Sequence, residues 1–262
     1  MRPVTELDLG EPLPLAAGPN LYISPQPSAA GEPRPVAAPG IAHWCVQALD
    51  GAGARAALEA GGAAFLSPPT ALGTGFLYAY GHASGGGLFE LETAPFLPAE
   101  PPAWFGHVAF VSAEAERLAT FYADLLDAPL APGGRFRNNP RIDTVAGLTG
   151  VDLQAWWVRA EDFTLEFWRY FAPPAPAADS ARWYPHLGLE VDGLEPVLKR
   201  IAALGGTASD VSEGTDGRSA SAADPDGNAL PLIELTEQAR GHGVAALPHR
   251  DVLARAAAVR AA

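Results

Sequence analysis

The stretch DPDGNALPLIELTE (Asp224–Glu237) combines a tight turn with a strand that carries one carboxylate, and it organises the rest of the chain. Turn residues followed by an apolar run predict a buried strand, in which Glu234 stands where an apolar residue would be expected. Two earlier segments end in a similar way, GLFELET (Gly87–Thr93) and FTLEFWRY (Phe163–Tyr170). A strand ending that recurs in this manner marks a repeated structural unit.

Each of these endings is preceded, at similar intervals, by a strand that begins with a histidine. The three strands are HWCVQAL (His43–Leu49), HVAFV (His107–Val111) and HLGLEV (His186–Val191). An amphipathic helix and further short strands lie between each pair, so every unit is predicted to have the order β-α-β-β-β. One such unit cannot bury its apolar face alone, and it therefore needs a second unit beside it.

Proline clusters at 25–39, 95–102 and 173–185 divide the chain, because proline fixes φ and removes a backbone donor. We expect an α+β protein of tandem βαβββ modules, which form curved mixed sheets around a cavity. The predicted parts are a truncated N-terminal domain at 1–98, a complete domain at 103–237, and a tail with a short helix at 238–262.

Composition excludes several classes of partner. The 262 residues are 48% hydrophobic, which is enough for a packed core, and the net charge is −13. Strong negative charge argues against nucleic acid and anionic membranes as partners. The single cysteine, Cys45, cannot form an intramolecular disulfide, and no apolar run has the length of a signal peptide core or a membrane span. We expect a soluble, cytoplasmic protein.

Strand alternation places the repeated histidines and glutamates on a common face. In HLGLEV, Leu187 and Leu189 would pack on the helix, which leaves His186 on the opposite face. If the second and third units curl around one cavity, their concave faces bring together His107, Glu166, His186 and Glu234. Two imidazoles and two carboxylates suit Ni, Zn, Fe, Mn or Co. A single histidine or glutamate in a strand is more often a surface residue, so the hypothesis depends on the repeat.

The first unit also carries this pair, as His43 and Glu90. Its expected partner, residues 1–30, lacks a first strand and a helix, so we expect the N-terminal half to be structural and Cys45 to be a small core residue. The alternative is a homodimer in which two copies of the first unit pool His43 and Glu90.

The β-α-β-β-β repeat, the opening HVAFVSAEAERLATFYADLLDAP (107–129), the stretch LTGV (148–151) and the DPDGN…IEL ending together resemble the vicinal oxygen chelate superfamily. That group includes glyoxalase I, methylmalonyl-CoA epimerase, extradiol dioxygenases, and bleomycin and fosfomycin resistance proteins. The resemblance covers 105–236 and extends to 40–95. It implies one divalent metal ion held by the first and last strands of two modules, here by His107, Glu166, His186 and Glu234.

The resemblance implies a glyoxalase-like lyase or isomerase, in which two neighbouring substrate oxygens chelate the metal and an enediolate is stabilised. Glu166 or Glu234 would act as the base. Trp168 and Tyr170 share the face of Glu166 and are expected to line the pocket, while Arg137, in a glycine-bearing loop, would hold an anionic substrate. Two alternatives remain: an extradiol-type Fe(II) dioxygenase that uses His107, His186 and Glu234, and a metal-free drug- or metabolite-binding protein.

Overall fold

A computed structural model describes residues 21–25, 33–97, 103–159, 164–176 and 185–240. The short helix expected within 238–262 falls almost wholly outside these residues. The helices are α1 (Gly51–Ala60), α2 (Ala115–Leu126), α3 (Pro140–Ala146) and α4 (Leu194–Ala203). None of the described helices is long and apolar enough to cross a membrane.

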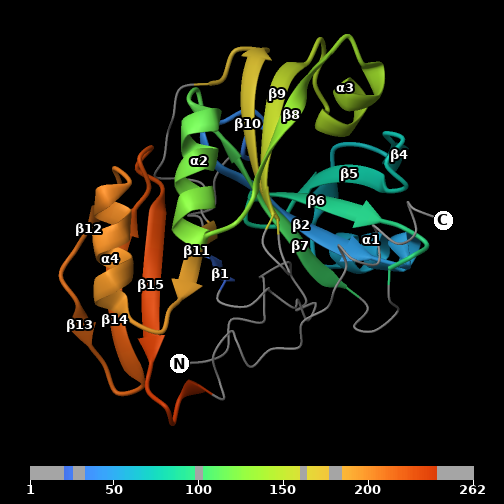
Figure 1. Cartoon of the computed structure of the whole chain (residues 1–262). Helices are drawn as coiled ribbons and strands as arrows, with labels where there is room; N and C mark the ends of the chain where they lie inside the picture. Colours follow the sequence, from blue (N-terminus) through green and yellow to red (C-terminus); the bar gives the residue numbers. More distant parts are fainter. Residues whose placement is uncertain (1–20, 26–32, 98–102, 160–163, 177–184, 241–262) are drawn as a thin grey trace.

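The strands form two mixed sheets, which confirms the predicted α+β fold of βαβββ modules (Figure 1). The nine-stranded sheet has the order β3-β5-β6-β2-β7-β10-β9-β8, with β4 paired to β5. Its strands are β2 (Gly40–Ala48), β3 (Ala64–Phe65), β4 (Thr70–Ala71), β5 (Leu77–His82), β6 (Leu88–Thr93), β7 (Trp104–Val111), β8 (Leu130–Arg137), β9 (Asp152–Arg159) and β10 (Thr164–Ala172).

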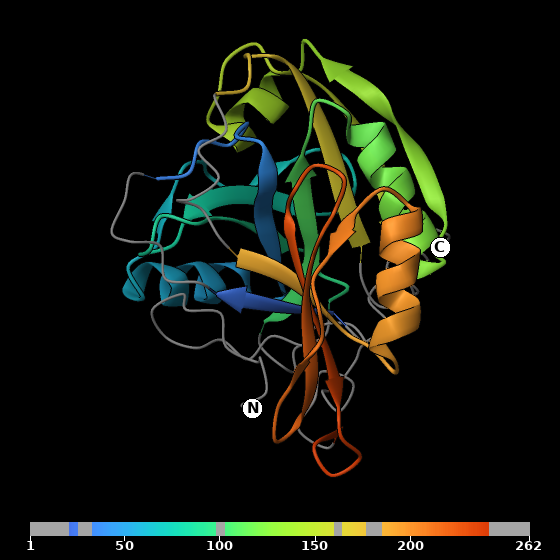
Figure 2. The ribbon, with the colours of Figure 1, turned by 90° about the vertical axis from the view of Figure 1, so that its left-hand side faces the viewer.

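The six-stranded sheet has the order β1-β11-β15-β14-β12, with β13 paired to β14. Its strands are β1 (Leu21–Pro25), β11 (Pro185–Glu190), β12 (Thr207–Ala208), β13 (Ser212–Glu213), β14 (Gly217–Ala223) and β15 (Ala229–Leu235). Figure 2 shows the blue strand β1 alongside β11, with which it pairs antiparallel.

The modules do not pair as expected from the sequence. The first module (β2 to β6) shares its sheet with the second (β7 to β10), whereas the third (β11 to β15) takes β1 as its neighbour. The two module-opening strands β2 and β7 pair antiparallel, and each has the last strand of its own module, β6 or β10, parallel to it on the other side. The strands are therefore not grouped along the expected boundary between 1–98 and 103–237. The opening strands of all three modules are apolar with alternating faces. The residue pattern within each strand therefore does not determine which two of them pair.

The turn of the organising stretch joins the two sheets. Tyr122 on α2 donates its hydroxyl proton to Asp224, at 3.0 Å, and Asp226 accepts hydrogen bonds from Ser112 and Arg117. A continuous apolar core runs beneath this joint and includes residues of both sheets, among them Phe110, Phe167, Leu187 and Leu232. Burying each such side chain stabilises the fold by roughly 1.5–3 kcal/mol.

Candidate metal centre

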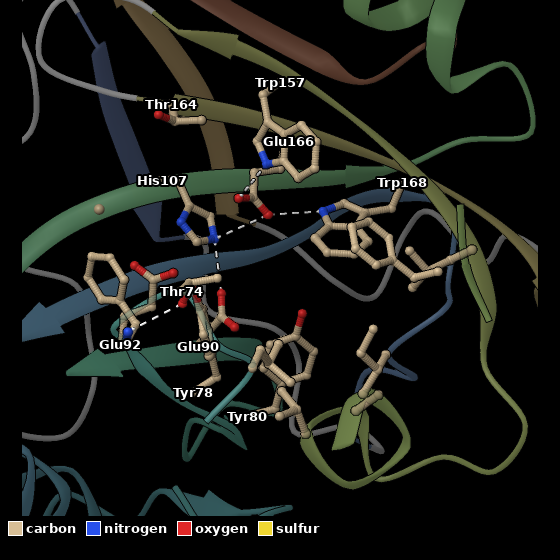
Figure 3. Close-up of a pocket in the computed structure, with 18 of the residues that line it drawn as sticks. Thr74, Tyr78, Tyr80, Glu90, Glu92, His107, Trp157, Thr164, Glu166 and Trp168 are labelled. Carbon is tan, nitrogen blue, oxygen red and sulfur yellow. Dashed lines mark hydrogen bonds and ion pairs between the residues drawn. The ribbon is translucent and has the colours of Figure 1, made fainter. Parts of the chain in front are cut away.

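Four neighbouring strands of the nine-stranded sheet direct a histidine or a glutamate onto its concave face: His43 on β2, Glu90 on β6, His107 on β7 and Glu166 on β10. His107 lies at the centre of the group, between Glu90 and Glu166 (Figure 3). Its Nε2 is 3.3 Å from Nε2 of His43, 3.1 Å from Oε2 of Glu90 and 3.7 Å from Oε2 of Glu166. His43 Nε2 is in turn 3.5 Å from Oε2 of Glu90.

Burial and charge perturb the protonation of this group. Burial lowers the pKa of His107, but the carboxylates of Glu166, Glu90 and Glu92 outweigh it and raise that pKa to about 10. Burial raises the pKa of Glu90, but hydrogen bonds from His107 and His43 outweigh it and bring that pKa down to about 2. The metal-free cluster is therefore held together by an ion pair between Glu90 and protonated His107.

The carboxylate of Glu166 is clamped by two indoles. Trp157 Nε1 donates to Oε1 at 2.9 Å, and Trp168 Nε1 donates to Oε2 at 3.1 Å (Figure 3). Trp157 stands opposite Glu166 in the β9–β10 register, and Trp168 follows two residues later on the same face of β10. The side chain is 14% exposed, against 7% for Glu90, so Glu166 is the carboxylate of this group with more access to the cavity.

Glu92 adds a further buried carboxyl group beside the cluster. It accepts a hydrogen bond from Nε2 of Gln47 at 2.6 Å. Burial raises its pKa to about 7. Together with Cys45, Glu90 and His107, it forms a second group of donor atoms that lie within 4.8 Å of one another.

The donor set fits a divalent metal ion. The donor atoms of His43, His107 and Glu166 lie within 4.8 Å of one another, and Glu90 contacts both imidazoles. Imidazole nitrogen and carboxylate oxygen together suit Zn, Ni, Fe, Mn or Co. More carboxylates than cationic groups converge here, so a dication would relieve their mutual repulsion.

The structure brings together only part of the site expected from the sequence. His107 and Glu166 meet, and Trp168 and Tyr170 line the cavity beside them. Arg137 is instead exposed at the end of β8, opposite Asp152 in the strand register, and it is not among the residues lining that cavity.

His186 and Glu234 belong to the other sheet, on β11 and β15. Glu234 Oε2 accepts hydrogen bonds from the backbone N–H of Leu194, at 3.0 Å, and from Arg218, at 2.5 Å. Leu194 is the first residue of α4, so this carboxylate stabilises the start of a helix. We therefore correct the expected grouping of His107 and Glu166 with His186 and Glu234.

Sequence reasoning assigned His43 and Glu90 to a structural half or to a site shared across a homodimer. The structure places both beside His107 and Glu166 within one chain, because β2 pairs with β7. The signal in the sequence was the completeness of the first module, which has a histidine strand, a helix and a glutamate strand. Residues 1–30 lack such a set.

A cavity of about 680 Å³ opens over the cluster. Its floor carries Glu90, Glu92, His107 and Glu166, and the indoles of Trp157 and Trp168 stand beside them. Tyr78 and Tyr80 of β5 close the side formed by the first module (Figure 3). A concave, mainly apolar pocket with a few convergent polar groups is the usual form of a small-molecule site.

Comparison with known proteins shows a glyoxalase-like pattern. Residues 107–233 match the family model described as a glyoxalase-like domain. Glyoxalase I from Zea mays superposes with a TM-score of 0.55, at 16% identity over 78% of this chain and 70% of that chain. A mutant of that enzyme gives 0.56 at 17% identity over the same shares. A glyoxalase family protein from Bacillus cereus is 18% identical, covers 50% of this chain and 92% of its own length, and gives 0.42. No curated protein sequence matches this chain.

Proposed function

Because the chain carries a glyoxalase-like domain and the fold of the vicinal oxygen chelate superfamily, we propose that it is a divalent-metal-dependent enzyme. The reaction is of the lyase or isomerase type, on a small molecule with two neighbouring oxygens. One observation carries this proposal: His43, Glu90, His107 and Glu166 converge in one cluster, and Glu90, His107 and Glu166 line the cavity.

These four residues would hold the ion. A bound dication supplies positive charge against the negative charge that develops on the substrate oxygens when a proton leaves the adjacent carbon. His43, Glu90 and His107 are buried, and their contacts with one another hold the cluster in place before a ligand binds. Apolar and aromatic side chains line much of the cavity, and this surrounding of low polarity strengthens electrostatic interactions at its floor.

Glu166 is the base in this proposal. It is more exposed than Glu90, and its carboxylate borders the cavity. The indoles of Trp157 and Trp168 fix the orientation of both oxygens, so that Glu166 can take a proton from the substrate carbon and return it to a neighbouring atom. Glu234 has no part in this step, because it is engaged at the start of α4.

A second candidate function rests on the same cluster. His43, His107 and Glu166 form a set of two histidines and one carboxylate, which is the ligand set of non-haem Fe(II) oxygenases. Selective binding of iron, with oxygen uptake and no proton exchange, would favour this candidate.

Proton exchange at carbon tests the proposal. The protein is loaded in turn with Ni, Zn, Co or Mn, and 2-hydroxyacetophenone in D₂O is followed by loss of its CH₂ signal in proton NMR. We expect exchange above the rate given by the free metal, and loss of that excess in Glu166→Gln but not in Glu234→Gln. No excess exchange with any metal would contradict the proton-transfer chemistry, and failure to bind any metal would leave a metal-free binding protein.

A further inference from the structure

The part of the cavity beside helix α3 is lined mainly by apolar side chains, with Thr74 and Asn139 as polar members. Both modules of the nine-stranded sheet contribute to it. The apolar residues are Leu72, Phe76, Phe136, Ile142, Val145 and Leu153. Most of them belong to one apolar cluster that also includes Tyr80, Trp168 and Tyr170. An apolar body in this cavity would therefore contact side chains that already pack together.

Helix α3 covers this part of the cavity and is firmly held. It is inserted between β8 and β9 and packs against β4 and β5 of the first module. Asn139 caps its start by accepting the N–H of Arg141, at 3.1 Å, and Pro140 begins it. Asp143 accepts the backbone N–H groups of Gly150 and Val151, at 2.9 and 2.8 Å. The apolar part of the cavity is thus preformed in the fold.

Charge around the cavity is unsuited to an anionic ligand. The ionisable lining groups that the structure describes include three carboxyls, Glu90, Glu92 and Glu166, against His107 and the exposed Arg159. The tyrosines add no positive charge, and burial raises the pKa of Tyr78, Tyr80 and Tyr170, so that they stay neutral hydrogen-bond donors. A carboxylate or phosphate placed under α3 would lose its hydration without gaining a counter-charge.

We propose that the cavity takes a neutral ligand with a largely apolar body. The body lies under α3, against Ile142 and Leu72, and its two neighbouring oxygens point toward the metal centre. This inference deepens the proposed function, on which the placement of the oxygens rests. It assigns the chain to substrates without carboxylate or phosphate tails, and it replaces the anionic substrate expected from Arg137.

Three probes with one chelating head test this assignment. They are acetohydroxamate, 2-naphthohydroxamate and 6-carboxy-2-naphthohydroxamate, titrated by calorimetry into metal-loaded and metal-free protein. We expect the naphthyl probe to bind about a hundredfold more tightly than the acetyl probe, the factor given by burying roughly 110 Å² more apolar surface. The added carboxylate should weaken binding by about tenfold or more.

Substitutions in the apolar part of the cavity test whether the naphthyl group of the probe binds there. Ile142→Asp on α3 and Leu72→Asp on the first module should each weaken the naphthyl probe by about tenfold or more and leave acetohydroxamate unchanged. Leu49→Asp is the matched control, because Leu49 is 39% exposed and does not line the cavity. Thermal unfolding shows whether each variant is folded. Because Ile142 and Leu72 lie in different modules, either variant alone can test the inference if the other does not fold.

The outcomes separate this inference from the metal proposal. If no probe binds more tightly to the metal-loaded protein, the proposal of a metal centre is wrong. The ratio of the dissociation constants of the acetyl and naphthyl probes in metal-free protein then still tests the apolar part of the cavity. Equal affinities for these two probes, or tighter binding of the carboxylated probe, would overturn the inference.

Discussion

The Nε2 atoms of His43 and His107 lie 3.3 Å apart although 64 residues separate them in the chain. Each histidine belongs to the opening strand of its own module, and the antiparallel pairing of β2 with β7 sets His43 opposite Ala109. The two rings meet edge to face, with centroids 5.5 Å apart. One chain thus contains both imidazoles of the proposed metal centre, and the site needs no second copy.

Metal affinity should depend on the indoles that hold Glu166. Trp157→Phe removes the donor to Oε1, so the carboxylate can turn away, and we expect the metal dissociation constant to rise about tenfold. Metal titration followed by calorimetry measures this change. Trp44→Phe is the matched control, because Nε1 of Trp44 is buried and has no hydrogen-bond partner among the described residues. Equal metal affinity in the two variants would show that the indole bond does not position Glu166.

Glu234 should matter for stability and not for metal binding. Glu234→Gln weakens its bond to Arg218 and its interaction with the start of α4, which should lower the free energy of unfolding by about 1 kcal/mol. Denaturant unfolding measures this loss, and metal titration should give the wild-type affinity. A variant that lost the metal while keeping its stability would return Glu234 to the ligand set.

Metal affinity should increase with pH. The pKa of His107 is raised to about 10, so its imidazole carries a proton at neutral pH in the metal-free protein, and that proton must leave before Nε2 can bind a metal. We expect the logarithm of the association constant to rise by about one for each pH unit between pH 6 and 8. Calorimetry in buffers of different ionisation enthalpy counts the protons released. No released proton would mean that His107 is not a ligand.

Stability of the metal-free protein should depend on Glu92. Its pKa is about 7 in the folded protein, above the usual 4.5, so the folded state binds the proton more tightly than the unfolded state. The stabilisation is present below pH 4.5 and is lost as the pH rises through 7. Glu92→Gln should therefore reduce the fall in Tm between pH 5 and pH 7.5, and the exposed Glu213→Gln should not. An equal fall in Tm between pH 5 and pH 7.5 in the wild type and in Glu92→Gln would show that Glu92 does not cause this pH dependence.

Local patterns in the sequence were sufficient to predict the modules, but they did not predict which modules share a sheet. The helix of the second module was predicted from apolar spacing, and α2 buries Leu118, Phe121 and Tyr122 as that spacing requires. Strand alternation predicted a common face for Glu166, Trp168 and Tyr170, and the structure places all three along the cavity that His107 also lines.

The rest of the site depends on which strands meet, and that is a property of the whole chain. His43 and Glu90 lie on β2 and β6, and they join the cluster only because β2 pairs with β7. The matched glyoxalase-like range, 107–233, spans the second and third modules, which the structure places in different sheets. Arg218 lies on β14, and its pairing with Glu234 depends on the register of β14 against β15.

The most direct test of the metal centre is the metal content of the purified protein, measured by elemental analysis beside His43→Gln and His186→Gln. We expect about one divalent ion per chain in the wild type and in His186→Gln, and loss of that ion in His43→Gln, because the nine-stranded sheet holds the proposed ligands. Retention of the metal in His43→Gln together with its loss in His186→Gln would show that the metal is bound by the second and third modules instead.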